Sequence, residues 1–134
     1  KSKGYVFKYK GVSVTMNGAA KKLIKKAGKP SKKTVKKSCA YKGKDRTYTY
    51  KDFQLKTYSK TNNGAEYVSE IRFRSNKAVT KEGIRIGSSL KAVTKKYGKA
   101  KARFGVYTFK KGSSKLQIML NGNKVSAIRY FASK

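Results

Sequence analysis

The sequence predicts an α+β fold in which two tandem repeats, each a helix followed by an antiparallel sheet, form a single domain over residues 1–134. Three observations support this prediction. Short segments alternate between apolar and polar residues, as strands with one buried face do. Two other segments have apolar residues at helical spacing, and each is followed by a glycine. The same order of elements occurs twice, at about residues 5–75 and 83–131.

The first repeat begins with a predicted hairpin and a short helix. Residues 5–14 alternate and are interrupted by Lys10-Gly11, which predicts a tight turn. Gly28 ends the helix that follows, and Asn17 is its predicted N-cap. The apolar side of this helix, opposite a face of lysines, is formed by Ala20, Leu23, Ile24 and Ala27.

The remaining elements are a loop, a second helix and six strands. The basic stretch 29–37 has little pattern and is predicted to be a loop. In the second repeat, Gly83–Ile86 leads to a helix that ends at Gly98, with Leu90, Val93, Thr94 and Tyr97 at helical spacing. The six strands are predicted at Thr47–Tyr50, Phe53–Tyr58, Tyr67–Arg74, Val106–Phe109, Leu116–Leu120 and Val125–Phe131.

Several short segments match between the repeats. Gly11-Val-Ser-Val corresponds to Gly83-Ile-Arg-Ile, Tyr48-Thr-Tyr to Tyr107-Thr-Phe, and Val68-Ser-Glu-Ile-Arg-Phe to Val125-Ser-Ala-Ile-Arg-Tyr. The first repeat carries an extra segment between its helix and its sheet, and this segment contains Cys39, the chain's single cysteine. Self-similarity of this kind is typical of a duplicated unit.

The chain is strongly cationic. It has 36 lysines and arginines against 5 acidic residues, a formal net charge of +31. Such a surface attracts polyanions, most strongly at low salt. Only six of the basic residues are arginine, which favours diffuse attraction over specific readout. High charge with few aliphatic residues is typical of disorder, but ten tyrosines and the alternating patterns favour a folded chain.

The duplicated unit, with a Gly-hydrophobic-x-hydrophobic segment before the second helix and Tyr-Gly-Lys at its end, resembles the β-lactamase-inhibitor-protein-like domains. These occur in secreted proteins and lipoproteins of Gram-positive bacteria. The segments Ser38–Ala40 and Asp45–Tyr50 also resemble lipoproteins of gut clostridia.

This resemblance implies one curved sheet of about eight strands, with the helices packed on one face and the concave face free to bind. It also implies an extracellular or cell-surface location, with a signal peptide or lipoprotein anchor removed. Two features depart from the family. The inhibitor proteins carry disulfides, which a chain with one cysteine cannot form internally, and this chain is far more basic. Inhibition of a β-lactamase is therefore not carried over.

Strand alternation divides the sheet residues into two faces. One face holds the predicted core residues Tyr67, Ile71, Phe73, Leu116, Ile118, Leu120, Ile128 and Tyr130. The other mixes arginine, tyrosine, methionine and amides, a composition typical of binding interfaces. Its candidate site residues are Gln54, Lys56, Tyr58, Arg72, Arg74, Gln117, Met119, Arg129 and Phe131. Ordinary solvated sheet positions, with arginine stems covering apolar neighbours, would have the same composition.

Residues suited to catalysis or metal binding are few. Histidine, the commonest general base and metal ligand, is absent. A single cysteine cannot build a zinc site, and no nucleotide-binding glycine motif occurs. The acidic residues Asp45, Asp52, Glu66, Glu70 and Glu82 fit ion pairs with surrounding lysines. We therefore expect no enzyme, no cofactor and, because no apolar run is long enough, no transmembrane segment.

The leading interpretation is a secreted or cell-surface binding domain, monomeric, that associates with anionic cell-envelope polymers or with an acidic protein. A nonspecific nucleic-acid-binding protein is one alternative, although arginines are few and no reader motif occurs. An inhibitor or adhesion module that uses the concave sheet face is another. Deliberate supercharging of a neutral parent protein would give the same surface without a ligand.

Overall fold

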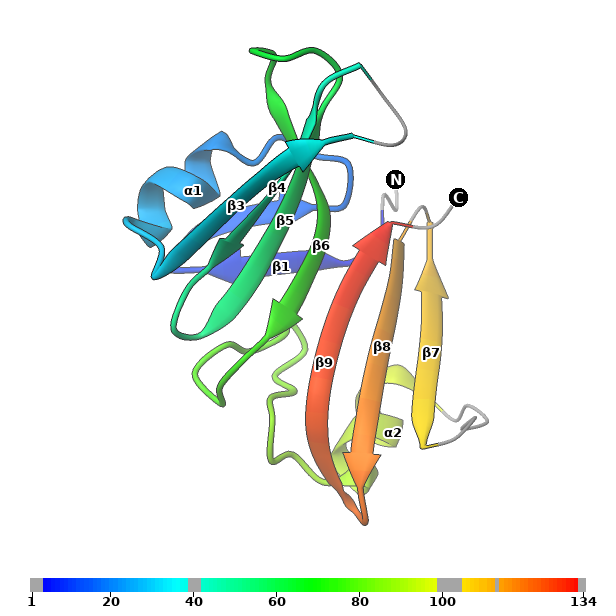
Figure 1. Cartoon of the computed structure of the whole chain (residues 1–134). Coiled ribbons are helices and arrows are strands. Elements are labelled where there is room, and N and C mark those ends of the chain that lie inside the picture. The colour runs from blue at the N-terminus through cyan, green and yellow to red at the C-terminus, as the bar shows by residue number, and fades with distance from the viewer. Residues whose placement is uncertain (1–3, 39–41, 99–104, 113, 133–134) are drawn as a thin grey trace.

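The computed structural model describes residues 4–38, 42–98, 105–112 and 114–132, so Cys39 lies outside the described residues. Its nine strands and two helices make a mixed α+β fold rich in antiparallel sheet (Figure 1). In chain order the elements are β1 Val6–Tyr9, β2 Val12–Thr15, α1 Lys21–Ala27, β3 Lys32–Lys37, β4 Lys44–Thr49, β5 Phe53–Ser59, β6 Glu66–Phe73, α2 Leu90–Tyr97, β7 Val106–Lys111, β8 Ser114–Asn121 and β9 Lys124–Ala132.

Seven strands form the main sheet, in the order β3-β4-β5-β6-β9-β8-β7, and every neighbouring pair is antiparallel. β6 and β9 join the two halves of this sheet through only three residue pairs, which we call the seam. β1 and β2 pair with each other in a separate two-stranded sheet. The prediction of one sheet of about eight strands is therefore corrected to seven strands plus a hairpin, because the first hairpin packs on the sheet instead of extending it.

One face of the main sheet is covered. Figure 1 shows α1 and the β1–β2 hairpin behind β3–β6, and α2 behind β7–β9. Contacts between aromatic rings agree with this layering. The ring centre of Phe7 in β1 lies 5.3 Å from that of Phe53 and 5.5 Å from that of Phe73. The ring centre of Tyr97 in α2 lies 5.3 Å from that of Phe109. The buried sheet residues on this face include Tyr48, Phe53, Leu55, Ile71, Phe73, Phe109, Leu116, Ile118, Ile128 and Tyr130.

Local sequence explains the hairpin and the helices. Lys10 and Gly11 both have positive φ angles, 48° and 86°, as the tight turn of a two-residue hairpin requires. Both predicted helices are present, and Ser89 caps α2 by accepting a hydrogen bond from the Ala92 backbone N–H at 3.1 Å. The prediction of Asn17 as the N-cap of α1 is wrong. The N-cap position is Ala20, while Asn17 has a φ of 66° and donates its backbone N–H to Val68.

Two predictions about irregular segments are also wrong. Residues 29–37 contain a strand, β3, which pairs with β4 over six positions. All six β3 residues are exposed, so no buried face produces an alternating pattern. Conversely, Gly83–Ile86, which the repeat predicts to be a strand like its counterpart Gly11–Val14, lies in no strand. It forms a turn in which Thr80 accepts a hydrogen bond from the Ile84 N–H through its hydroxyl and donates its own N–H to the Ile84 carbonyl.

Two β-bulges shift the alternation of the sheet. Ser69 is an extra residue in β6, between the partners of Thr57 and Lys56, and Ser126 is an extra residue in β9. Val68 therefore joins the core with its side chain fully buried, whereas Tyr67, predicted to be in the core, is half-buried and contacts the Tyr58 ring at 5.6 Å. A bulge adds one residue and so reverses which side chains point inward beyond it.

Equivalent contacts occur in both halves of the chain. The hydroxyl of Ser69 donates to the Lys56 carbonyl at 3.0 Å, and that of Ser126 donates to the Met119 carbonyl at 3.3 Å. Next to each bulge, a backbone N–H donates to the loop before the helix: Val68 to Gly18 at 2.9 Å, and Val125 to Ser88 at 2.8 Å. Each helix is thus tied to the last strand of its own half in the same way.

Candidate functional site

The face of the main sheet opposite the helices is uncovered in the part of the chain that the structure describes. Strand register places most of the predicted site residues on this open face, because their sequence neighbours on β5, β6, β8 and β9 are buried on the other side. They are Gln54, Lys56 and Tyr58 on β5, Arg72 on β6, Gln117 and Met119 on β8, and Arg129 and Phe131 on β9. Arg74 lies apart, past the end of β6, where its guanidinium donates to the Tyr50 carbonyl and supports the β4–β5 turn.

Four polar side chains form a row across the middle of the open face. Gln54 is the register partner of Arg72, Arg72 of Arg129, and Arg129 of Gln117. The row therefore crosses β5, β6, β9 and β8 in turn, at the usual strand spacing of about 4.8 Å. We call these four residues the arginine row: Gln54, Arg72, Arg129 and Gln117.

The two arginines face each other directly across the seam. Like charges in directly opposite positions of an antiparallel pair destabilise a sheet. Arg72 has a counterion, because its Nη2 lies 3.4 Å from Glu70 Oε2, with the side chains 50% and 16% exposed. The contact is electrostatic and lacks hydrogen-bond geometry, since Glu70 Oε2 is buried and has no hydrogen-bond partner among the described residues.

Arg129 is held differently. Its guanidinium carbon lies 4.4 Å from the centre of the Phe131 ring, a cation–π contact. Its Nε is buried and has no hydrogen-bond partner in the described part of the chain. A buried, unpaired N–H costs about 1–3 kcal/mol. Arg129 therefore destabilises the fold in two ways: the like charge of Arg72 lies opposite it, and its Nε–H has no hydrogen-bond partner among the described residues.

Two hollows lie on either side of the Arg129–Phe131 pair. The smaller, about 150 Å³, has an apolar floor beside the arginine row, and we call it the Met119 hollow; it is lined by Arg72, Gln117, Met119, Ala127, Ile128 and Arg129. Met119 is 43% exposed, an unusual exposure for a large apolar side chain. The larger hollow, about 630 Å³, is lined by both polar and apolar atoms and includes Lys56, Tyr58, Glu70 and Phe131 among its lining residues.

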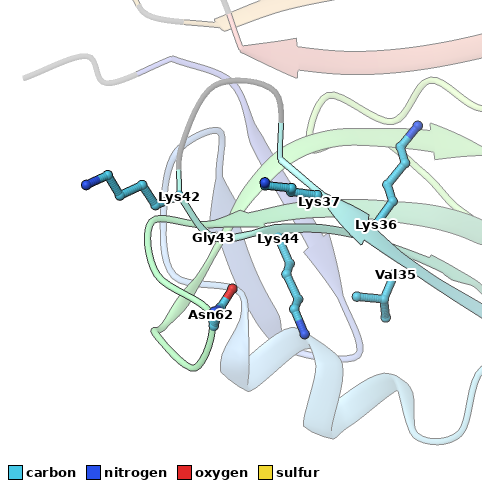
Figure 2. A pocket seen from close by; sticks show the side chains of 7 residues that line it. All are labelled: Val35, Lys36, Lys37, Lys42, Gly43, Lys44 and Asn62. Carbon is cyan, nitrogen blue, oxygen red and sulfur yellow. The ribbon is translucent and has the colours of Figure 1, made fainter.

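A third depression lies at the β3 edge of the sheet and has different chemistry. Its volume is about 550 Å³, and it is lined by Val35, Lys36, Lys37, Lys42, Gly43, Lys44 and Asn62. Figure 2 shows the lysine side chains spreading away from one another, with Lys36 and Lys44 on opposite sides of the strands. Ammonium groups spread in this way supply diffuse positive charge and not a convergent site.

Two of the acidic residues serve the covered side of the fold. Glu66 accepts hydrogen bonds from the Tyr48 hydroxyl and the Thr57 hydroxyl, both at 2.7 Å, and Glu82 accepts one from the Tyr97 hydroxyl at 2.7 Å. Burial, and then the hydrogen bond to Glu66, raise the pKa of Tyr48. Burial is also the main cause that raises the pKa of Tyr97. Within the described residues, no three cysteine or acidic side chains gather as metal ligands would.

Sequence reasoning missed Glu70 and Ala127. Glu70 is two positions before Arg72 on one strand, so alternation alone could have placed the two on one face. Ala127 could not be recognised, because a small residue becomes part of a hollow only through its neighbours on β8.

Neither described helix is long and apolar enough to cross a membrane. Comparison with known proteins gives no match: no protein-family model, no curated protein and no solved structure is significantly similar to this chain.

Proposed function

We propose that the chain is a non-enzymatic, secreted or cell-surface binding domain that associates with anionic polymers of the cell envelope. The observation that carries this proposal is the distribution of its charge. Exposed lysines lie on α1, on α2 and along the β3 edge strand, so positive charge covers the helical face and one edge of the sheet. With a net charge of +31, the domain attracts polyanions over a broad surface.

We further propose that the domain is a tandem duplication related to the β-lactamase-inhibitor-protein-like domains, with one curved sheet surface for binding. Several features support the duplication. Each half contains a helix tied to a bulged last strand, and the bulged residue is a serine that donates to the neighbouring strand in both. Glycine follows both helices, at positions 28 and 98.

Binding to a purified anionic wall polymer at increasing salt tests the proposed function. We expect tight binding at about 0.05 M salt and a loss of at least tenfold at about 0.5 M, because salt screens exposed charges. Equal binding at both salt concentrations would refute the electrostatic account. An oligothymidylate of equal charge is the comparison for the nucleic-acid alternative: at least tenfold tighter binding to this strand than to the wall polymer at matched salt would favour that alternative.

A protein-binding role for the open face is a second candidate function. The arginine row favours it, because interfaces are enriched in arginine and depleted in lysine, and the centre of this face has arginine where most of the surface has lysine.

A further inference from the structure

We propose that the arginine row binds a carboxylate side chain of an acidic protein segment, with a neighbouring apolar side chain of that segment in the Met119 hollow. This inference rests on the proposed function, since it assigns a specific partner to one face of a binding domain. It makes the open face distinct from the rest of the cationic surface.

The first step is the geometry of the row. Two guanidinium groups project from directly opposite positions of β6 and β9, and an amide side chain flanks each of them. Guanidinium groups match a carboxylate through paired N–H donors. The glutamines add groups that both donate and accept, which suits the peptide groups on either side of a carboxylate residue. A lysine at either flank would add charge without this capacity.

The second step is the retention of Arg129. Its unpaired Nε and the like charge opposite both destabilise the free protein. An anion bound between the two arginines would remove the repulsion. A position that costs stability in the free state and is relieved by a ligand is typical of a binding site.

The third step separates a protein segment from a phosphate polymer. The Met119 hollow is apolar and directly beside the row, so it can accept an aliphatic side chain that a polyphosphate or polymer backbone lacks. Glu70 lies next to Arg72 and would repel a dense polyanion, whereas a single carboxylate can bind on the side of the row away from it.

The two sides of the seam differ in a way that gives the ligand a direction. In the register of the sheet, Met119 lies opposite the small Ala127, and Lys56 lies opposite Glu70. The β8–β9 side is therefore apolar and the β5–β6 side is charged. We expect the apolar side chain of the segment over β8–β9 and its solvated end over β5–β6.

The test uses the whole chain and a fluorescent, end-blocked peptide at about 0.15 M salt, in which a single glutamate lies two residues from a leucine in an otherwise polar, uncharged sequence, so that both side chains can face the sheet. Arg72→Gln/Arg129→Gln is expected to weaken peptide binding about tenfold or more. Lys25→Gln/Lys95→Gln removes the same charge from the exposed faces of α1 and α2, and is expected to weaken it less than about twofold. Arg72→Lys/Arg129→Lys keeps the charge and should still lose affinity, because lysine lacks the paired donors.

Met119→Lys gives the sharpest outcome. This variant is more positive than the wild type, yet the loss of the apolar hollow should weaken peptide binding severalfold, while binding of polyphosphate stays equal or rises. Circular dichroism and the melting temperature of each variant show whether it is folded. Met119→Lys replaces a side chain at an exposed position.

The outcomes separate this inference from the proposed function. If the two double glutamine variants lose peptide affinity equally, or if Met119→Lys binds the peptide more tightly, the arginine row is no specific site and the inference is overturned, although polyphosphate binding can persist. If the wild type does not bind polyphosphate even at low salt, the proposed function itself fails.

Discussion

Replacing Arg129 with methionine is expected to stabilise the free protein, although it removes the central residue of the proposed site. The gain has two sources. Arg129 Nε is a buried donor without a partner among the described residues, which costs about 1–3 kcal/mol. The like charge of Arg72 in the directly opposite position adds about 0.2–1 kcal/mol.

One contribution opposes this gain. The substitution removes the cation–π contact with Phe131, worth about 0.5–1 kcal/mol at a partly exposed site. The unbranched methionine side chain can keep much of the apolar contact with the ring. The free energy of unfolding should therefore rise by about 1 kcal/mol or somewhat more, which corresponds to an increase in melting temperature of about 4 °C for a chain of this size.

Arg72→Met is the matched control. It relieves the same repulsion, but it also leaves Glu70 without the guanidinium at 3.4 Å, and Glu70 Oε2 is buried. The two effects oppose each other, so this variant should gain little or lose stability.

Urea unfolding of the wild type and both variants, followed by tyrosine fluorescence at about 0.15 M salt, measures these differences as shifts in midpoint at a constant slope. A lower midpoint for Arg129→Met than for the wild type would contradict the reasoning. Equal gains from the two variants would also contradict it, because charge repulsion alone would then account for the result.

Two further predictions concern the covered face. Phe7→Leu should lower the free energy of unfolding by about 1–2 kcal/mol, because Phe7 is fully buried against the sheet. Val35→Ala, at a position 48% exposed, should change it by less than about 0.5 kcal/mol. Equal effects of the two substitutions in urea unfolding would mean that the β1–β2 hairpin does not pack against the main sheet. Ultraviolet absorbance should show that five tyrosines do not ionise near pH 10 in the folded protein, because burial raises their pKa values, namely those of Tyr5, Tyr48, Tyr50, Tyr97 and Tyr130. Since the unfolded chain does ionise there, these tyrosines should lower stability as the pH rises above about 10, and normal titration of all ten would contradict this.

Elements with one buried face could be predicted from the sequence, and an element without one could not. The α2 helix has apolar residues on the side that packs against the sheet, and its extent, Leu90–Tyr97, agrees with the prediction. β3 has six exposed residues, and its strand conformation depends on pairing with β4. Local periodicity reports burial, so an edge strand exposed on both faces gives no such signal.

The candidate site was predictable in part for the same reason. Alternation placed Arg72 and Arg129 on the side of the sheet away from the core. Their position directly opposite each other depends on the register between β6 and β9, which lie far apart in the chain. Tyr67 was assigned to the core because alternation assumes a regular strand, whereas the bulge at Ser69 turns Val68 inward instead.

A duplication would by itself place two equivalent arginines opposite each other, because a strand that pairs with its own copy around a pseudo-twofold axis brings equivalent residues together. Departures from that symmetry carry more weight. Ala127 of β9 takes the place of Glu70 of β6, and Met119 of β8 takes the place of Lys56 of β5, as the matching serine bulges show. Both differences remove charge on the same side of the seam and create the Met119 hollow. Inheritance of a symmetric unit does not explain this one-sided apolar surface, whereas an acidic segment with an apolar neighbour does, and for that reason Met119→Lys is a more decisive variant than either arginine substitution.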